Sequence, residues 1–333
     1  MSTVSPAAGS QFLFVIGVEK CGTTSLFRAM ESLHQFNLTK RKESGFFRTQ
    51  YERGVAHFES MFRDSFQGTA YNTDITPLYH RFPKVMRRLQ TFNAKKKILI
   101  MLRNPVRRAF SHYTHDIINH VATGERSTGF NDARAFSFLD LWEAKRAYFL
   151  RYEPIVRDAF DRFGKQNCHV LFFEDIVHDW SHQASRLDEF FGFDEPVLAS
   201  VRLPHENRID SVPYVFSFGE AEHGEYWMAQ KRRRDVVFLD GLTDTQVRNA
   251  MLAQGSFTLA VPDSVVAEMI QWFEPDIQAL EKLLGVDLQG WRERFELGHA
   301  FASVEHEDLE AVRAYRKDLP GTVSFAGWGL RAL

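Results

Sequence analysis

The feature that most constrains the fold is an apolar run that ends in glycine and leads into an amphipathic helix. The run, Gln11–Gly17, reads QFLFVIG and is typical of a buried strand. Thr23–Leu33 is predicted to be a helix. Its apolar residues Leu26, Met30 and Leu33 recur at helical spacing. The chain therefore begins as a strand, a glycine-bounded loop and a helix.

Strands and helices alternate after this first unit. Further strands are predicted at Ala70–Ile75, Ile98–Leu102 and His169–Phe173. The predicted helices are Tyr51–Phe62, Lys84–Phe92, Pro105–His120, Leu139–Phe163 and His182–Phe191. The strands are continuous apolar runs, as expected when helices cover both faces of a parallel sheet. The predicted fold class is α/β, with a P-loop-like central parallel β-sheet flanked by helices.

The C-terminal third is predicted to elaborate this fold. Residues 205–262 contain several glycines and the basic run Lys231–Arg234, which favours irregular loops with one strand at Val236–Leu239. This segment is expected to cover the acceptor or the cofactor. Helical spacing returns at Ser264–Leu284, and Gly285 stands where a C-cap glycine belongs.

Residues 1–10 are predicted to be a flexible arm. No linker is evident beyond them, so residues 11–333 are expected to form a single domain. A further short helix is predicted near Asp308–Tyr315 in the C-terminal tail.

Composition excludes several classes of protein. Lys and Arg total 41 against 43 Asp and Glu, which argues against a nucleic-acid-binding protein but leaves room for a local basic pocket. Cys21 and Cys168 are too few for a disulfide framework. The N-terminal residues carry no signal peptide, and no apolar stretch is long enough to span a membrane. A cytoplasmic protein without a membrane span is therefore predicted.

The loop Gly17–Ser25 has the chemistry of an anion site. Glycines let the backbone approach a ligand closely, and successive N–H groups at a helix N-terminus supply positive potential. Lys20 adds a point charge, and Thr23, Thr24 and Ser25 add hydroxyl donors. The simpler alternative is a strand-to-helix turn with a capping hydroxyl. The combination of strand, lysine and hydroxyls favours phosphate binding.

The loop departs from the usual nucleoside-triphosphate pattern G-x-x-x-x-G-K-[ST]. Gly17 and Gly22 have the required separation, but Thr23 occupies the position of the lysine, which has moved to Lys20. A different anhydride donor, with no obligatory metal, therefore fits better. A P-loop kinase or another nucleoside-triphosphate enzyme remains the alternative.

A second basic motif follows the strand predicted at Ile98–Leu102. Pro105 suits the first position of a helix, so Arg103 falls at the carboxyl end of the strand and Ser111 two turns along the helix. In an open parallel sheet this edge is the ligand crevice. Arg103 and Ser111 are therefore expected to bind a second phosphate. The alternative is a solvated basic helix start.

With both motifs in hand, the chain resembles the sulfotransferases that use 3′-phosphoadenosine 5′-phosphosulfate. Among these, the heparan-sulfate-type branch and its bacterial relatives are the most similar. The matching segments are Lys20–Leu26 for the 5′-phosphosulfate loop, Arg103–Tyr113 for the 3′-phosphate motif, Lys42–Phe47 for K-E-x-x-F-F, and Phe273–Trp291 for the C-terminal helix and turn.

The resemblance implies a donor, an acceptor and roles for the site residues. The co-substrate would be 3′-phosphoadenosine 5′-phosphosulfate, used without a metal. The acceptor would be a hydroxyl, less often an amine, of a glycan or small molecule. Lys20 would stabilise the leaving group, and Glu43 would be the base. The residues expected to bind the nucleotide are Lys20, Cys21, Gly22, Thr23, Thr24, Ser25, Arg103 and Ser111.

Alternatives and departures accompany these roles. Glu43 follows a basic stretch and is alternatively a solvated carboxylate, and Asp74 is a second candidate base. Ile75 stands where the E-K-[ST]-P-x-Y segment of that branch has lysine, so Lys42 or His80 would have to supply the second cation.

The basic loop that closes over the nucleotide in that branch is not recognisable. Arg208 or Lys231–Arg234 would have to replace it. A sulfotransferase-fold binding protein without catalysis therefore remains open.

Overall fold

The computed structural model describes residues 10–65, 71–113, 142, 149–204, 261 and 263–297 with their side chains. Elsewhere it gives the backbone of strands only. The chain divides into two compact units. The first comprises residues 1–104, 151–207 and 276–287, and the second comprises residues 105–150, 208–275 and 288–333. That residues 11–333 form a single domain stays a prediction.

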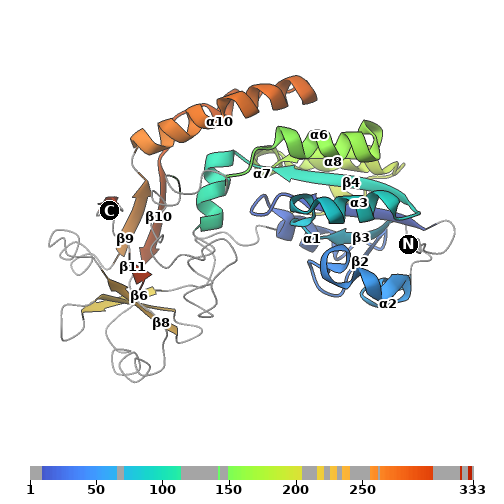
Figure 1. Ribbon diagram of the computed structural model, residues 1–333, viewed down its shortest axis with the longest axis horizontal. Helices are drawn as coiled ribbons and strands as arrows, with labels where there is room; N and C mark the ends of the chain where they lie inside the picture. The colour runs from blue at the N-terminus through green and yellow to red at the C-terminus, as the bar shows by residue number, and fades with distance from the viewer. Residues whose placement is uncertain are drawn as a thin grey trace. The chain divides into compact units, whose positions relative to one another are not determined.

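A five-stranded parallel sheet forms the centre of the first unit, in the order β2-β3-β1-β4-β5. Its strands are β1 (Gln11–Gly17), β2 (Phe36–Leu38), β3 (Tyr71–Ile75), β4 (Lys95–Leu102) and β5 (Cys168–Phe172) (Figure 1). In the register of the sheet, Phe14 of β1 lies opposite Asp74 of β3 and Ile98 of β4. All carboxyl ends therefore meet at one edge.

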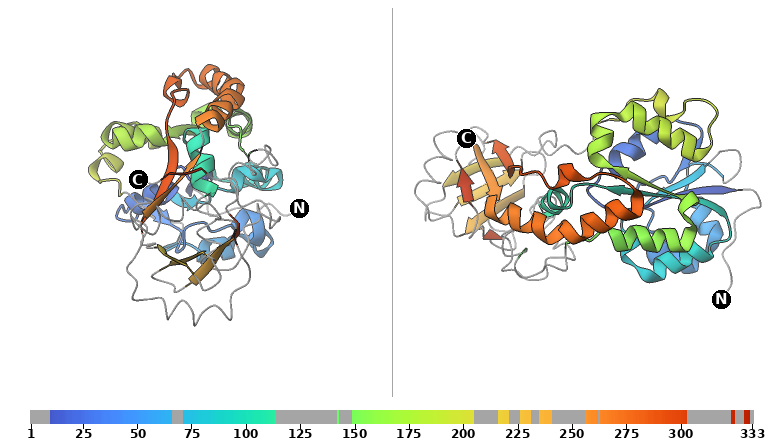
Figure 2. Two further views of the ribbon diagram at one scale, coloured as in Figure 1. Left: turned by 90° about the vertical axis from the view of Figure 1, so that its left-hand side faces the viewer. Right: turned by 90° about the horizontal axis from the view of Figure 1, so that it is seen from above.

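Helices cover both faces of this sheet, which confirms the predicted α/β class. Figure 2 shows α1 and α8 on one face and α3 and α6 on the other. The helices are α1 (Thr23–Met30), α2 (Gly54–Ser60), α3 (Pro83–Thr91), α6 (Glu153–Phe163), α7 (Phe173–His178), α8 (Trp180–Phe191) and α10 (Asp263–Leu284). Short helical turns are η1 (Phe46–Gln50), η2 (Tyr51–Arg53), η3 (Tyr79–Arg81), η5 (Lys165–Asn167), η6 (Leu198–Ser200) and η7 (Gln289–Trp291).

The described helices and strands differ from the predictions at a few places. The continuous helix over Leu139–Phe163 is wrong, because residues 149–152 are not helical and α6 begins at Glu153. Pro154 in the first turn explains the start, since proline is favoured there. Strand β2 and helix α7 were not predicted. Gly285 is confirmed as the residue after α10, with φ 73° and an N–H bonded to the carbonyl of Glu281.

The prediction of irregular loops over residues 205–262 is wrong, whereas the one strand predicted among them, Val236–Leu239, is confirmed. Strands β6 (Phe216–Glu220), β7 (Tyr226–Gln230) and β8 (Asp235–Asp240) pair antiparallel in that order, and β9 (Ser256–Val261) follows. In the sequence, Gly224, Gly241 and Gly255 lie between these strands, so the glycines are turn signals.

The C-terminal tail adds three strands to the second unit. They are β10 (Leu297–Ala302), β11 (Val323–Ser324) and β12 (Gly329–Arg331). Strands β10 and β12 pair antiparallel with β9, and β11 pairs parallel with β8. The predicted helix near Asp308–Tyr315 lies outside the described residues. Among the helices whose positions are described, we find none with both the length and the apolar character that crossing a bilayer requires.

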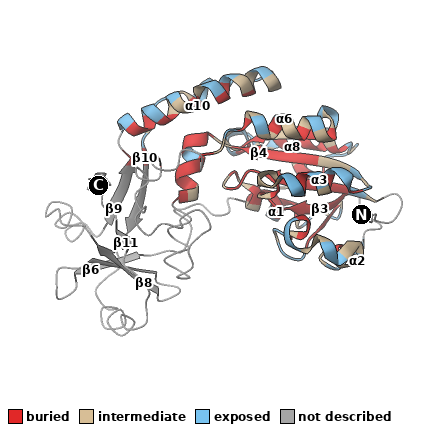
Figure 3. Ribbon diagram, viewed as in Figure 1, coloured by how far each residue is buried: buried red, intermediate tan, exposed pale blue. Residues whose placement is uncertain are grey.

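An aromatic cluster packs one face of the central sheet, where Figure 3 shows the strands almost wholly buried. Phe58 of α2 stacks on Phe46 with ring centroids 4.3 Å apart, and Phe92 meets Phe12 of β1 edge-to-face at 5.0 Å. Phe47 meets Phe14 edge-to-face at 5.4 Å. These rings are buried, and aromatic pairs in such geometries add stability beyond their buried area.

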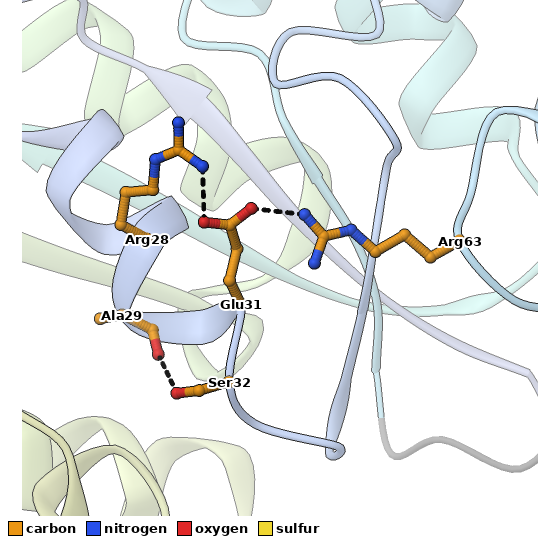
Figure 4. Close-up of polar contacts among 5 residues, drawn as sticks. All are labelled: Arg28, Ala29, Glu31, Ser32 and Arg63. Carbon is orange, nitrogen blue, oxygen red and sulfur yellow. Dashed lines mark hydrogen bonds and ion pairs between the residues drawn. The ribbon is translucent and has the colours of Figure 1, made fainter.

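The C-terminal end of α1 is held by one carboxylate between two arginines (Figure 4). Glu31 accepts hydrogen bonds from Arg28 at 2.6 Å and from Arg63 at 2.5 Å. Partial burial raises the pKa of Glu31, but the hydrogen bonds and charges of the two arginines outweigh it and lower that pKa overall. The contact joins the end of α1 to the segment after α2.

Phe58→Ala is predicted to lower the free energy of unfolding by about 3–5 kcal/mol, because it leaves a cavity among packed rings. Val177→Ala is the control, because Val177 is 49% exposed, and we expect a change within about 0.5 kcal/mol. Urea unfolding of both variants measures the difference. Equal effects of the two substitutions would contradict this description of the core.

Candidate active site at the carboxyl edge of the sheet

The turn between β1 and α1 requires glycine at its last position. Gly22 is the N-cap of α1 with φ 88°, in the left-handed region. A Cβ there would lie 2.9 Å from the ring of Phe173, which follows β5. No side chain among the described residues caps α1, and its first turn carries no acid. The N–H groups at this helix end are therefore oriented to receive an anion.

Arg103 contacts the backbone of Lys20 at this turn. The Nη1 of Arg103 donates to the carbonyl oxygen of Lys20 at 3.4 Å. Two residues before Lys20, the N–H of Val18 donates to the carbonyl of Met101 on β4 at 2.8 Å. The loop is thus bonded to the end of the strand that carries Arg103, and both cations share the carboxyl edge.

Two more contacts hold Arg103 in addition to the one with Lys20. Its guanidinium lies 4.6 Å from the centroid of the Phe173 ring, and its carbonyl accepts from the hydroxyl of Tyr152 at 2.9 Å. The N–H of Tyr152 in turn donates to Asp276 at 2.7 Å, and that of Glu153 donates to the same carboxylate at 3.0 Å. Burial raises the pKa of Asp276 overall, and these two N–H bonds oppose that rise. No local sequence pattern predicts this contact, because Asp276 is remote from α6 along the chain.

Residues of the loop other than Lys20 are largely buried. Thr23 and Ser25 are 5% and 6% exposed, and Thr24 is half-buried. The thiol of Cys21 is 3.7 Å from the carbonyl of Glu19, to which it donates. That these residues bind a nucleotide stays a prediction.

The anion loop also contains a buried acid, for which the phosphate-binding pattern has no role. Glu19 is 8% exposed and forms an ion pair with Arg81 of η3. A carboxylate here would repel an anion, but the guanidinium offsets its charge. The ion pair also ties the loop to the segment that follows β3.

Ser111 belongs to the second unit. Residues 105–113 are helical, which confirms Pro105 as a helix start, and Ser111 is buried on that helix. Because Arg103 belongs to the first unit, its pairing with Ser111 on one phosphate stays a prediction.

Glu43 lies at the same sheet edge as Lys20. Its N–H donates to the carbonyl of Ile75, the last residue of β3, at 3.1 Å. Its carboxylate is 42% exposed and is 2.7 Å from the Nζ of Lys42. Glu43 follows β2 in the chain, but its hydrogen bond to Ile75 joins it to the end of β3, which is the neighbour of the strand that leads into the loop of Lys20.

Lys20 and Glu43 share an unusual backbone conformation. Within the described part of the chain, they are the two non-glycine residues with positive φ, at 69° and 66°. This conformation costs of order 1–3 kcal/mol for such residues, and it concentrates at functional sites. Strained backbone therefore coincides with the two residues predicted to be catalytic.

Asp74 and the two replacement cations also lie at this edge. The carboxylate of Asp74 is fully buried and accepts from three hydroxyls, which disfavours the alternative in which it is the base. The Nδ1 of His80 is 3.1 Å from the carbonyl of Ile16, and its ring packs where a Cβ on Gly17 would stand. Whether Lys42 or His80 is the second cation stays a prediction. Arg208 and Lys231–Arg234 lie outside the described residues.

With this geometry in view, comparison with known proteins decides the family. Residues 11–210 match the sulfotransferase domain. The chain belongs to the sulfotransferase domain family. Over the described residues, this sulfotransferase-family chain has no group of three His, Cys, Asp or Glu side chains suited to a metal ion.

The relatives of this sulfotransferase-family protein include two glycan-modifying enzymes. Heparan sulfate glucosamine 3-O-sulfotransferase 6 of Homo sapiens is 27% identical over 195 residues, which cover 54% of this chain and 51% of that protein. Heparan sulfate glucosamine 3-O-sulfotransferase 3B1 of Mus musculus is 28% identical over 200 residues, 58% of this chain and 49% of that protein. The chain spans about half the length of these relatives.

A solved structure has the same fold. A sulfotransferase from Alicyclobacillus acidocaldarius superposes with a TM-score of 0.56 at 21% identity, covering 86% of this chain and 100% of that chain. The likeness supports the arrangement of a central parallel sheet between helices.

Gly22→Ala is predicted to destabilise the protein and disorder the anion loop. The left-handed φ costs about 1–2 kcal/mol for alanine, and the contact with Phe173 adds to it. Gly192→Ala is the matched control, because φ is 76° there but nothing lies within 4 Å of the added Cβ. Thermal unfolding should show the larger loss for Gly22→Ala. A loss no greater than that of the control would mean that Phe173 yields without cost.

Proposed function

We propose that this protein transfers the sulfuryl group of 3′-phosphoadenosine 5′-phosphosulfate to an acceptor hydroxyl. The observation that carries the proposal is the placement of Lys20 and Glu43, both in left-handed backbone, at the edge where Arg103 contacts the loop. Lys20 follows β1, and the N–H of Glu43 is bonded to the end of the neighbouring strand β3. Membership of the sulfotransferase domain family supports the choice of the transferred group.

The residues at this edge suit a nucleotide that carries two separate anionic groups. The uncapped N-terminus of α1 and the side chain of Lys20 suit the 5′-phosphosulfate, since both offer positive potential. Arg103 suits the second phosphate, because a guanidinium offers paired donors to phosphate oxygens. Ser111 is proposed to join Arg103 there. Together they account for two anionic groups without a metal.

Glu43 is proposed to take the proton of the acceptor hydroxyl. The acceptor oxygen then forms a bond to sulfur while the bond between sulfur and the bridging phosphate oxygen breaks, with its electron pair going to that oxygen. Lys20 neutralises the charge that develops on this oxygen. The products are a sulfate ester and 3′-phosphoadenosine 5′-phosphate, and Glu43 returns its proton to water. In this scheme, catalysis depends on positioning and charge stabilisation.

The acceptor is proposed to be a hydroxyl, less often an amine, of a glycan or small molecule. The names of the human and mouse relatives describe 3-O-sulfation of a glucosamine, which supports a hydroxyl. A role for residues 205–262 in covering the acceptor, and a cytoplasmic location, stay predictions.

Lys20→Ala and Arg103→Ala are predicted to weaken binding of 3′-phosphoadenosine 5′-phosphate. Each removes a charge-assisted contact, worth about 1.5–3 kcal/mol, or about 10–150-fold in Kd. Calorimetric titration in EDTA measures the change, with ATP and Mg²⁺ as the comparison ligand. Preference for Mg-ATP by the unaltered protein would refute the proposed donor and favour a nucleoside-triphosphate enzyme.

Glu43→Gln is predicted to lower kcat for sulfuryl transfer by about 10²–10⁴-fold, because the amide cannot take a proton. Binding of the nucleotide should be unchanged. The control is Glu189→Gln on α8, an exposed position, which should keep full activity. The assay follows release of 3′-phosphoadenosine 5′-phosphate during acceptor screening. Full turnover by Glu43→Gln would exclude it as the base.

A further inference from the structure

Asp74 forms the centre of a buried group of hydroxyls beneath Glu43. Its Oδ2 accepts from the hydroxyl of Ser44 at 2.6 Å and from that of Tyr79 at 2.8 Å, and its Oδ1 accepts from Thr76 at 2.8 Å. Asp74 is 0% exposed, Tyr79 is 0% and Thr76 is 3%. Ser44 directly follows Glu43, so the group begins one residue from the proposed base.

The same three hydroxyls receive the backbone N–H groups that follow Glu43. The hydroxyl of Ser44 accepts from the N–H of Phe46 at 3.2 Å, and that of Tyr79 accepts from Phe47 at 3.4 Å. The hydroxyl of Thr76 is 3.5 Å from the N–H of Gly45, which donates to it. Each hydroxyl therefore joins the carboxylate of Asp74 to one amide of the segment 45–47.

The carboxylate fixes the direction of these hydrogen bonds. An ionised aspartate only accepts, so each hydroxyl must donate to it and has only lone pairs left for the amides. Burial raises the pKa of Asp74 overall, and the hydrogen bonds from Ser44, Thr76 and Tyr79 oppose that rise. Burying a carboxylate among neutral hydroxyls is costly, whereas an apolar residue would pack here without that cost.

We propose that Asp74 is a positioning residue that holds Glu43 in its left-handed backbone conformation, and so sets the direction of its carboxylate toward the acceptor. This inference rests on the proposed function. Glu43 is 42% exposed at its side chain and has φ 66°, a conformation that the surrounding segment must enforce. The N–H of Glu43 is bonded to the carbonyl of Ile75 on β3, and the side chain of the next residue, Ser44, is bonded to Asp74.

Asp74→Asn tests the proposal with little change of shape. The amide of asparagine is both a donor and an acceptor, so at least one hydroxyl must turn its proton toward an amide N–H of residues 45–47. Two donors then face each other and the segment shifts. We expect kcat to fall by about 10²-fold, the effect of a displacement of about 1 Å, while KM for the donor and Kd for 3′-phosphoadenosine 5′-phosphate stay unchanged.

A second readout does not depend on turnover. Hydrogen–deuterium exchange of the amides of residues 45–47 should speed up in Asp74→Asn, and exchange in α1 should not. Thr76→Val removes one of the three hydroxyls and should give smaller changes of both kinds. If Asp74→Asn fails to fold, Thr76→Val tests the proposal in its place.

Asp188→Asn is the matched control. Asp188 is also buried, and its carboxylate accepts from the N–H groups of Val197, Leu198 and Ala199 at 2.8–3.1 Å. Asp188→Asn should lower the free energy of unfolding, as Asp74→Asn does, but it should leave kcat of the folded protein unchanged.

The outcomes separate this inference from the proposed function. Turnover retained in full by Asp74→Asn, or an equal loss of kcat in Asp188→Asn, would overturn the positioning role alone. A loss of nucleotide binding equal to the loss of kcat would also overturn it, since that is a general structural effect. Absence of sulfuryl transfer by the unaltered protein would instead refute the proposed function.

Discussion

The parallel pairing of β1 with β3 on one side and β4 on the other is the constraint on which the rest of the structure depends. Parallel strands bring their carboxyl ends to one edge, so each loop that leaves the sheet there faces its neighbours. The anion loop leaves β1, Arg103 leaves β4, and the carbonyl of Ile75 at the end of β3 receives the N–H of Glu43. The sheet therefore brings the anion loop, a guanidinium and a carboxylate to one edge, although they lie far apart in the sequence.

The carboxyl edge of the sheet must present positive charge to an anion while its charged side chains stay in fixed positions. Glu19 introduces a negative charge into the anion loop, and Arg81 offsets it. The guanidinium of Arg103 contacts the ring of Phe173 and the carbonyl of Lys20, and the backbone carbonyl of Arg103 accepts from the hydroxyl of Tyr152. None of these three partners carries a negative charge, so these contacts fix the position of Arg103 without a carboxylate among them. Preorganisation of this kind is the usual source of electrostatic catalysis.

Much of this arrangement could be predicted from the sequence, because the signals are local. A glycine-bounded loop after an apolar run predicted the turn at Gly22, and the position of Pro105 predicted a helix start after Arg103. The contacts of Asp276 with α6 and of Asp74 with three hydroxyls could not be predicted, since they depend on how distant elements pack. Of the strands between residues 216 and 261, the sequence predicted β8 alone, because the glycines indicate irregular loops as readily as the ends of strands.

The left-handed backbone of Lys20 and Glu43 has a consequence for how this chain responds to selection. Glycine removes a steric cost of about 1–2 kcal/mol at such a φ, against about 0.5–1 kcal/mol of added chain entropy in the unfolded state. A search for heat-resistant variants that ignores activity would therefore tend to accept glycine at both positions. The same search would discard the two groups proposed to perform the chemistry. Thermal robustness and turnover thus oppose each other at these two residues, and an engineer should hold them constant.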